Sequence, residues 1–438
     1  MSPTFQALSN RNYRLYAAGG VVSNTGTWMQ RVAQDWLVLQ LSANNGTALG
    51  ITTGLQFLPM LLLSPYAGLI ADRFPKRRLL QVTQLMMAGP ALLLGLLAVT
   101  GVAQPWHVYV LAFVFGIGTA FDAPARQSFV SEMVEPELLT NAVGLNSASF
   151  NAARMLGPAL AGVLIAALGS GAEATGWVII LNGLSYGAVI YVLQRMRPED
   201  LDSAELAARG KGMIREGMRY VRGRPDLMLV LAIVFFAGTF GLNFQMTSAL
   251  MATDVYGKGA TEYGLLGTTM AVGSLAGALL AARRGRPRYR LVVLAALAFG
   301  TVEILAGLAP SYLTFVLWTP LLGITALTMI TAANATVQLG TAPMMRGRVM
   351  ALYMMIFMGG TPVGAPIVGW IGETFGARWT LIGGGLGTIL GVLLAAAVFS
   401  RSQGMLDPEV NDRPRLRKRV RAPAVRSSLT SGKLERAR

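Results

Sequence analysis

The stretch GLIADRFPKRRLL, from Gly68 to Leu80, decides how this sequence is read. It places five charges within seven positions, at Asp72, Arg73, Lys76, Arg77 and Arg78. The runs GITTGLQFLPMLLLSPYA before it and QVTQLMMAGPALLLGLLAVT after it are almost entirely uncharged. Such runs are long enough to cross the roughly 30 Å hydrocarbon core of a bilayer as helices. A short basic connection between them is typical of a loop kept on the cytoplasmic side, which explains the bases but not the acid.

The composition is that of a membrane protein. Hydrophobic residues make up 53% of the chain and charged residues 13%, compared with about 25% charged residues in soluble domains. The net charge of +16 falls mainly in every second connection and in the C-terminal tail, a membrane-topology pattern that gives no reason to expect a nucleic-acid partner. Without cysteine and with one histidine, His107, we expect no metal site and no cofactor, and proton handling would fall to carboxylates.

Apolar runs recur almost from end to end and predict an all-α membrane protein with twelve transmembrane helices. They lie near residues 13–40, 49–71, 79–101, 106–126, 146–168, 175–194, 227–253, 262–282, 290–309, 312–335, 349–371 and 378–399. Basic residues follow the even-numbered runs, so both termini are expected to face the cytoplasm. The protein is expected in the inner (cytoplasmic) membrane of the cell.

The longest connection, residues 195–226, divides the chain into two predicted six-helix bundles, 1–194 and 227–400. Part of it, AELAARGKGMIREGMRYVRG, has the spacing of an amphipathic helix on the inner membrane surface. A solvated helical linker explains this segment equally well. The basic stretch 401–438 is expected to be a disordered cytoplasmic tail that attracts anionic lipid headgroups.

Two echoes between the halves predict a pseudo-symmetric 6+6 repeat. GLIADR at the end of the second run recurs as GALLAARR after the eighth, and LGPALAG in the fifth has a counterpart, GGTPVGAPIVG, in the eleventh. Such repeats are typical of secondary transporters, which bind their substrate near the bilayer midplane between the halves.

GLIADRFPKRRLL also resembles the loop 2–3 signature of the major facilitator superfamily, G-x-L-a-D-r-x-G-r-k-x-x-l. Pro75 replaces the second glycine, and the matching residues are Gly68, Asp72, Arg73, Lys76, Arg77 and Leu80. The segments FQALSNRNYRLYAAGGVVSNTGTWMQRVAQDWLVLQL and FDAPARQSFVSEMVEPELLTNAVGLNSASFNAARMLGPALAG resemble the transmembrane secretion effector branch, with its enterobactin-exporter-like and drug:proton antiporter members. The resemblance covers about residues 5–400 and implies a transporter rather than an enzyme; we expect a monomer.

The same resemblance implies a conformational latch on the inner side. Asp122 and Arg126 end the fourth run, and Asp122 would pair with Lys76 or Arg77. Asp72 would face the start of the eleventh helix, whose N-terminus favours an anion. In this interpretation the latch holds the outward-facing state and consists of Gly68, Asp72, Arg73, Lys76, Arg77, Asp122 and Arg126. The alternative is a set of interfacial charges with no conformational role.

Three ionisable residues within the runs are candidates for proton coupling, because charges inside a membrane usually mark function or pairing. Arg31 and Asp35 are four residues apart and share one face of the first helix. Asp35 would exchange protons while Arg31 tunes it, unless the two form an interfacial ion pair that closes the outer side. Glu303, in the ninth run, is either a second protonation site or a residue that reaches the interface.

Other polar residues are candidates for the cavity. Arg154 would hold a substrate anion or bond structurally across the bundle. Amides are unfavourable against lipid, which adds Asn146, Asn151, Asn243, Gln245 and Asn334. Large apolar side chains in the seventh, tenth and eleventh runs suit a cavity for bulky substrates, or else contact with lipid or packing: Phe235, Phe236, Phe244, Met246, Trp318, Met354, Met355, Phe357 and Met358.

The element LGPALAG resembles the G-P-x-x-G-G motif of antiporters in the superfamily. Its Gly157, Pro158 and Gly162 permit close helix approach and local bending.

Together these features predict proton-coupled efflux of a small organic compound, such as a drug, siderophore or secondary metabolite, by alternating access. No G-x-x-x-x-G-K-[ST] sequence is present, so the chain itself supplies no ATP site of that type. The alternatives are a lipid or metabolite translocator, and a non-transporting membrane sensor or assembly partner, which would show no flux in liposomes.

Overall fold

The computed structural model describes residues 3–202, 213–282 and 289–399 of the 438-residue chain, so the predicted tail lies outside it. Every regular element of the described part is a helix. Eleven helices in this part are long and apolar enough to cross a membrane. The all-α membrane fold is therefore confirmed.

The helix missing from these eleven is the first, α1 (Arg11–Leu41). Its 31 residues span about 46 Å at 1.5 Å per residue, which is more than a bilayer core. This helix is more polar than the other eleven, and it buries Gln30, Gln34 and Asp35 inside the protein. Since α1 lies among α2, α5 and α6, its polar side chains need not face lipid. The count of twelve crossings stays a prediction.

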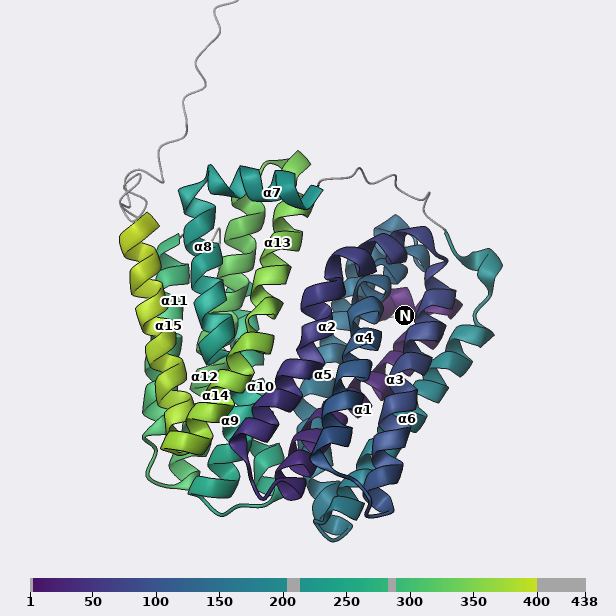
Figure 1. The fold of residues 1–438 in the computed structure, drawn as a ribbon. Coiled ribbons are helices and arrows are strands. Elements are labelled where there is room, and N and C mark those ends of the chain that lie inside the picture. Colours follow the sequence, from purple (N-terminus) through teal and green to yellow (C-terminus); the bar gives the residue numbers. More distant parts are fainter. Residues whose placement is uncertain (1–2, 203–212, 283–288, 400–438) are drawn as a thin grey trace, which may run out of the picture.

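The helices form two bundles (Figure 1). The first contains α1 and α2 (Gly46–Arg73), α3 (Lys76–Val99), α4 (Pro105–Phe129), α5 (Pro136–Ala167) and α6 (Ala172–Arg195). The second contains α8 (Pro225–Phe236), α9 (Phe244–Leu250), α10 (Ala260–Ala282), α11 (Tyr289–Gly307), α12 (Tyr312–Gly340), α13 (Arg346–Gly359), α14 (Thr361–Phe375) and α15 (Arg378–Phe399).

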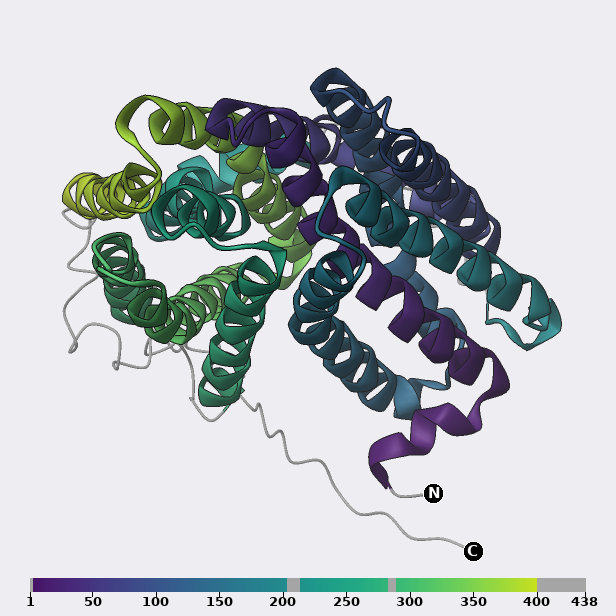
Figure 2. The ribbon, with the colours of Figure 1, turned by 90° about the horizontal axis from the view of Figure 1, so that it is seen from below.

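The helix pairing of the first bundle recurs in the second. α2 packs on α4 as α10 packs on α12, and α3 packs on α4 and α6 as α11 packs on α12 and α15. Between the bundles, α2 lies against α14 and α5 against α10, which is visible when the molecule is seen from below (Figure 2). Each contact pairs the second predicted membrane helix of one half with the fifth of the other half. An internal repeat produces this reciprocal pairing.

The bundles touch near the end that carries α9 and diverge toward the end that carries α7 (Met213–Arg222) (Figure 1). Glycines bring the backbones together at the contacting end: a Cβ at Gly50 would lie 2.4 Å from the Ala365 carbonyl oxygen, and one at Gly162 would lie 2.5 Å from that of Ala260. Side chains at these positions would push the bundles apart.

Two of the predicted helices are interrupted in the second bundle, the seventh by π-helical turns and the eleventh at Gly360, which keeps α-helical dihedral angles. The seventh predicted run consists of α8, the π-helical turn η4 (Ala237–Gly241), α9 and the π-helical turn η5 (Met251–Val255). The eleventh is divided between α13 and α14, just before Pro362. The two breaks face each other, since a Cβ at Gly364 would lie 1.7 Å from the Thr239 carbonyl oxygen. The π-helical turns were not predicted, because the seventh run is largely apolar and its pattern does not mark them.

The described part of the predicted linker helix, α7, lies across one end of the second bundle (Figure 1). It packs on α13, and Glu216 forms an ion pair of 2.7 Å with Arg348. The rest of the amphipathic stretch, residues 203–212, lies outside the described residues. The boundaries 1–194, 195–226, 227–400 and 401–438 remain predictions.

Candidate functional site

A central cavity of about 490 Å³ lies between the two bundles. This is within the range that accommodates a drug-sized ligand. The first bundle lines it with residues of α1, α2 and α5: Trp28, Arg31, Val32, Asp35, Thr53, Gln56, Phe57, Phe150, Arg154 and Pro158. The second bundle adds the break before α9, residues of α9 to α13, and the start of α14, including Asn243, Phe244, Gln245, Met246, Ser248, Tyr263, Met270, Ser274, Phe357, Met358 and Thr361.

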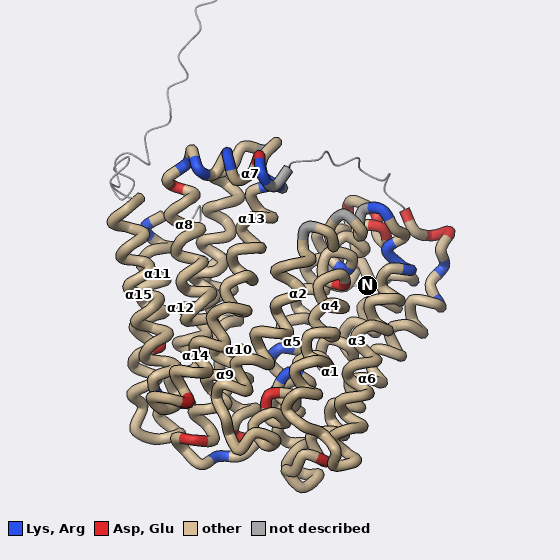
Figure 3. The backbone as a smooth tube through the Cα atoms, in the orientation of Figure 1, with Lys and Arg blue, Asp and Glu red and all other residues tan. Residues whose placement is uncertain are grey.

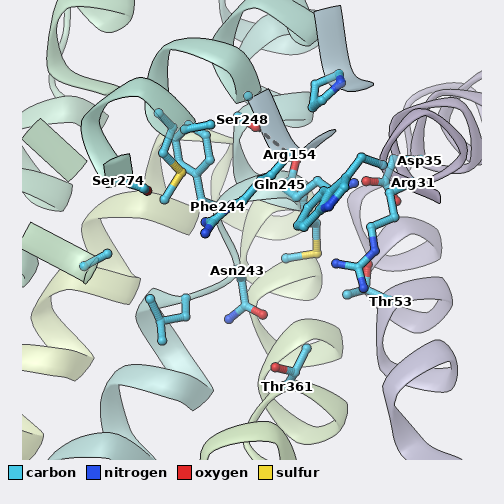
Figure 4. Close-up of a pocket in the computed structure, with 18 of the residues that line it drawn as sticks. Arg31, Asp35, Thr53, Arg154, Asn243, Phe244, Gln245, Ser248, Ser274 and Thr361 are labelled. Carbon is cyan, nitrogen blue, oxygen red and sulfur yellow. Dashed lines mark hydrogen bonds between the residues drawn. The ribbon is translucent and has the colours of Figure 1, made fainter. Parts of the chain in front are cut away.

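Asp35 is the carboxylate of the cavity wall. It is 7% exposed, and Tyr263 Oη of α10 donates a hydrogen bond of 2.9 Å to its Oδ2. This bond joins the two bundles, because Asp35 belongs to α1. Among the described residues no ion pair within 4.0 Å involves Asp35. The Arg31–Asp35 ion pair that the sequence offered as an alternative is therefore not formed, although both side chains line the cavity (Figure 4).

The two arginines of the cavity lie over the same aromatic ring, that of Trp28. The guanidinium carbon of Arg31 is 4.7 Å from the centre of the Trp28 ring, and that of Arg154 is 5.6 Å from it. Arg31 Nε is buried and has no hydrogen-bond partner among the described residues. The arginines are therefore held by aromatic contacts, with donors left for a ligand.

The described part of the second-bundle wall is uncharged and mainly apolar, with a few amides and hydroxyls. Asn243 donates from Nδ2 to the Thr239 carbonyl at 2.9 Å, while its Oδ1 is buried without a partner in the described structure. Gln245, Ser248 and Ser274 also face the cavity, and Figure 4 shows Asn243 and Thr361 across from Arg31. Asn243, Gln245, Ser248 and Thr361 offer hydrogen bonds from the two interrupted helices, and Ser274 offers one from α10.

Glu303 lies one layer behind that wall. Its side chain is 1% exposed, so it does not reach the interface as one interpretation had it. Its carboxylate fits between two helices: a Cβ at Gly384 would lie 2.9 Å from Oε1, and one at Gly241 would lie 3.0 Å from Oε2. Oε2 has no hydrogen-bond partner among the described residues. Gly241 itself lines the cavity, so Glu303 touches the wall from behind.

The remaining cavity candidates lie elsewhere. Asn146 does not line the cavity. Asn151 donates to the Ser147 carbonyl of its own helix at 2.8 Å, and Asn334 accepts from Gln338 at 2.7 Å. These amides have partners one helical turn away, a solution that spacing alone does not reveal.

The structure also assigns cavity positions that were not singled out in the sequence, among them Trp28, Phe57, Phe150 and Tyr263. A signal for Trp28 existed, because it precedes Arg31 by three residues and so shares its helix face. Of the large apolar candidates, four line the cavity: Phe244, Met246, Phe357 and Met358.

Four charges of the predicted latch, Lys76, Arg77, Asp122 and Arg126, are bonded within the first bundle. Lys76 pairs with Glu132, and Asp122 pairs with Arg126 at 2.9 Å. Arg77 donates to the Leu193 carbonyl at 2.6 Å. The expected pairing of Asp122 with Lys76 or Arg77 is therefore wrong for this conformation.

Helix geometry gives the reason for this difference. Asp122 lies level with Thr83 and Gln84, which donate to its Oδ1 at 2.8 and 2.7 Å. Lys76 begins α3 seven residues earlier, about 10 Å away along the axis, where Glu132 is its neighbour. Gly68, Asp72 and Arg73 belong to the last turns of α2, but the Asp72 side chain lies outside the described part of the structure.

The LGPALAG element packs on two helices at once. A Cβ at Gly157 would lie 2.5 Å from Trp28 Cβ on α1, whereas Gly162 meets the start of α10. The Pro158 carbonyl oxygen lies 2.3 Å from the position of a Cβ on Gly264. Gly157 thus packs against Trp28 of α1, while Pro158 and Gly162 pack against α10 of the opposite bundle.

The two-bundle fold with a central cavity is that of a membrane transporter, and its match to a family model makes this chain a secondary transporter of the major facilitator superfamily, whose members are not enzymes. The chain belongs to the transmembrane secretion effector family, whose model matches residues 2–426. The predicted resemblance is thereby confirmed.

Individual relatives are more distant. The chain is 34% identical to the staphyloferrin A transporter of Staphylococcus aureus (strain NCTC 8325 / PS 47) over 142 residues, 32% of this chain and 36% of that protein. It is 28% identical to the multidrug efflux pump Tap of Mycolicibacterium fortuitum, over 84% of this chain and 90% of the pump. A bacterial homolog of the human lysosomal transporter Spinster, solved in an inward-facing, occupied conformation, superposes with a TM-score of 0.68 at 17% identity, covering 90% of this chain and 98% of the other.

Proposed function

We propose that this transporter exports a small organic compound across the cytoplasmic membrane in exchange for protons. The observation that carries the proposal is Asp35, a buried carboxylate that lines the cavity and accepts a hydrogen bond from the opposite bundle. A buried ionised carboxylate is costly in a membrane, and protonation removes that cost. A proton on Asp35 therefore changes the relative free energies of conformations that bury or expose it. Export is supported by the relative described as a multidrug efflux pump.

The orientation of the chain follows from its charges. Lys and Arg gather at the end of the molecule that carries α7 (Figure 3), and basic residues mark the cytoplasmic side. With that end inside, both termini are cytoplasmic and α1 is the twelfth crossing. The bundles meet at the opposite end, so the structure corresponds to an inward-facing state.

Alternating access then moves residues 1–194 against residues 227–400 around the cavity. In the outward-facing state the inner ends of the bundles approach, and Asp72, at the end of α2, comes within reach of the start of α13. Gly68 and Arg73 accompany it on α2, and the bonded charges Lys76, Arg77, Asp122 and Arg126 keep the inner end of the first bundle rigid during the movement.

The test uses everted vesicles with an acidified interior and a pH-sensitive dye. Lipophilic cations, lipophilic carboxylates, siderophores and lysolipids are added outside, and a transported compound should release protons from the interior. Asp35→Asn should abolish that release, because the variant has no group to titrate there. Asp254→Asn, which changes an exposed carboxylate outside the cavity, should leave it unchanged. Full exchange in Asp35→Asn would remove Asp35 from the mechanism.

A further inference from the structure

The charges that line the cavity do not balance. In the described structure three charged side chains face it, and two of them are arginines, Arg31 and Arg154. Asp35, the third, accepts its hydrogen bond from Tyr263 and makes no ion pair with either arginine in the described structure. The cavity therefore carries one net positive charge with Asp35 ionised and two with Asp35 protonated. A site of this sign attracts anions and disfavours cations.

The arginines also lack the partners that structural arginines have. Arg126 and Arg224 of this chain are bonded to carboxylates at 2.9 and 2.6 Å. Arg31 and Arg154 have no such carboxylate among the described residues, and Arg31 Nε is buried without any hydrogen bond there. A buried unpaired donor of a charged group is destabilising, and an incoming acceptor relieves this cost.

The surroundings of the two arginines are aromatic. Both guanidiniums lie over the Trp28 ring, and that of Arg31 also lies 5.5 Å from the Phe57 ring centre. Phe150 packs edge-on against Trp28, with 5.8 Å between ring centres. Flat apolar surface and guanidinium donors are thus presented together, and guanidiniums match the geometry of carboxylates.

We propose that the transported substrate is an organic anion, with an acidic group bound by Arg31 and Arg154 and an aromatic or similarly apolar body against Trp28, Phe57 and Phe150. This inference rests on the proposed function in taking the cavity as the transport site. It adds the substrate's charge. Exchange of a monoanion for a proton moves two charges in the same sense, so an inside-negative membrane potential favours export of this substrate class.

The test is equilibrium binding to the purified full-length protein in detergent, at one pH and without a gradient. Three probes share one ring system and differ in charge: tritiated 2-naphthoate, 2-naphthamide and 2-(aminomethyl)naphthalene. The carboxylate should bind at least about tenfold more tightly than the amide or the amine, the ratio expected for one hydrogen-bonded charge. A preference for the amine, equal binding of all three probes, or no binding of the carboxylate would overturn the proposal.

Variants locate the site. Arg154→Gln and Arg31→Gln should each weaken naphthoate binding about tenfold or more and leave thermal unfolding in detergent nearly unchanged, while Arg154→Lys should retain much of the affinity. The matched control is Arg195→Gln, because Arg195 also lies over an aromatic ring, Tyr191, at 5.0 Å, but outside the cavity. Naphthoate affinity unaffected by both cavity variants would contradict the assignment. Because no gradient is involved, this result is independent of whether Asp35 exchanges protons.

Discussion

The wall of the cavity that belongs to the first bundle carries Arg31, Asp35 and Arg154, whereas the described part of the opposite wall offers amides, hydroxyls and methionines. The helices behind the walls differ in the same way. α1 and α5 run without interruption for 31 and 32 residues, while the second wall includes the interruptions of two helices beside residues of α10, α11 and α12. Although the halves share their helix pairing, one supplies charge on uninterrupted helices and the other supplies uncharged polar groups at and beside interrupted ones.

The largest effect should come from filling the contact between the two breaks. Gly364→Ala places a Cβ 1.7 Å from the Thr239 carbonyl oxygen, so the helices must separate or the backbone must shift, at a cost of about 1–3 kcal/mol or more. Transport should fall to background, and the midpoint of thermal unfolding should drop by several degrees.

The control for this change is Gly383→Ala on α15, where a Cβ meets nothing within 4 Å; it should leave flux and unfolding unaltered. Normal transport by Gly364→Ala would show that the contact between the interrupted helices tolerates an added methyl group. The contrast between the interrupted and the uninterrupted helices would then have no functional meaning.

A tenfold effect is expected from the acid behind the second wall. Glu303→Gln keeps the shape of a side chain that is 1% exposed but cannot be ionised. If Glu303 is a second proton site, proton-driven flux in vesicles should fall about tenfold or more, the size of a typical coupling free energy. Exchange in the absence of a gradient should persist.

Glu173→Gln, at an exposed glutamate of α6, is the matched control for Glu303 and should transport normally. Unchanged proton-driven flux in Glu303→Gln would mean that Glu303 takes no part in proton coupling, which would then rest on the charged residues of the first-bundle wall.

A smaller change should follow loss of the bond between the walls. Tyr263→Phe removes the donor to Asp35 and should shift the equilibrium toward the outward-facing state severalfold to tenfold, as for one hydrogen bond of about 0.5–1.5 kcal/mol. The chain has no cysteine, so a single Ser248→Cys in the cavity can report access to a membrane-impermeant maleimide from outside, with faster labelling expected.

The control for Tyr263 is Tyr312→Phe, which loses a hydrogen bond of 2.9 Å to the Glu262 carbonyl within the second bundle. It should not change labelling. Equal labelling of the Tyr263 variant and its parent would mean that the Asp35 bond does not hold the outer end closed.

The smallest effect is expected at α7. Glu216→Gln removes the ion pair with Arg348. The Glu216 and Arg348 side chains are 54% and 27% exposed, and exposed ion pairs contribute about 0–1 kcal/mol to stability. Flux should stay within about twofold of the parent protein. A large loss of flux would indicate that α7 controls the position of α13, which lines the cavity with Phe357 and Met358.

Much of the fold could be predicted from the sequence. Apolar runs of helical length set the helices, and the signature around Asp72 pointed to the family. The sequence also identified Arg31, Asp35, Arg154, Asn243 and Gln245, because polar groups within apolar runs need protein partners.

Only the tertiary structure decided how these groups are paired. Lys76 takes Glu132 rather than Asp122 because axial level, not proximity in sequence, brings side chains together. Asp35 takes Tyr263, 228 residues away, and Glu303 becomes buried against Gly241 and Gly384. Composition and periodicity fix which segments become helices because they act along the chain. Partners across helices depend on how closely the backbones pack, and that is decided by the assembled bundles.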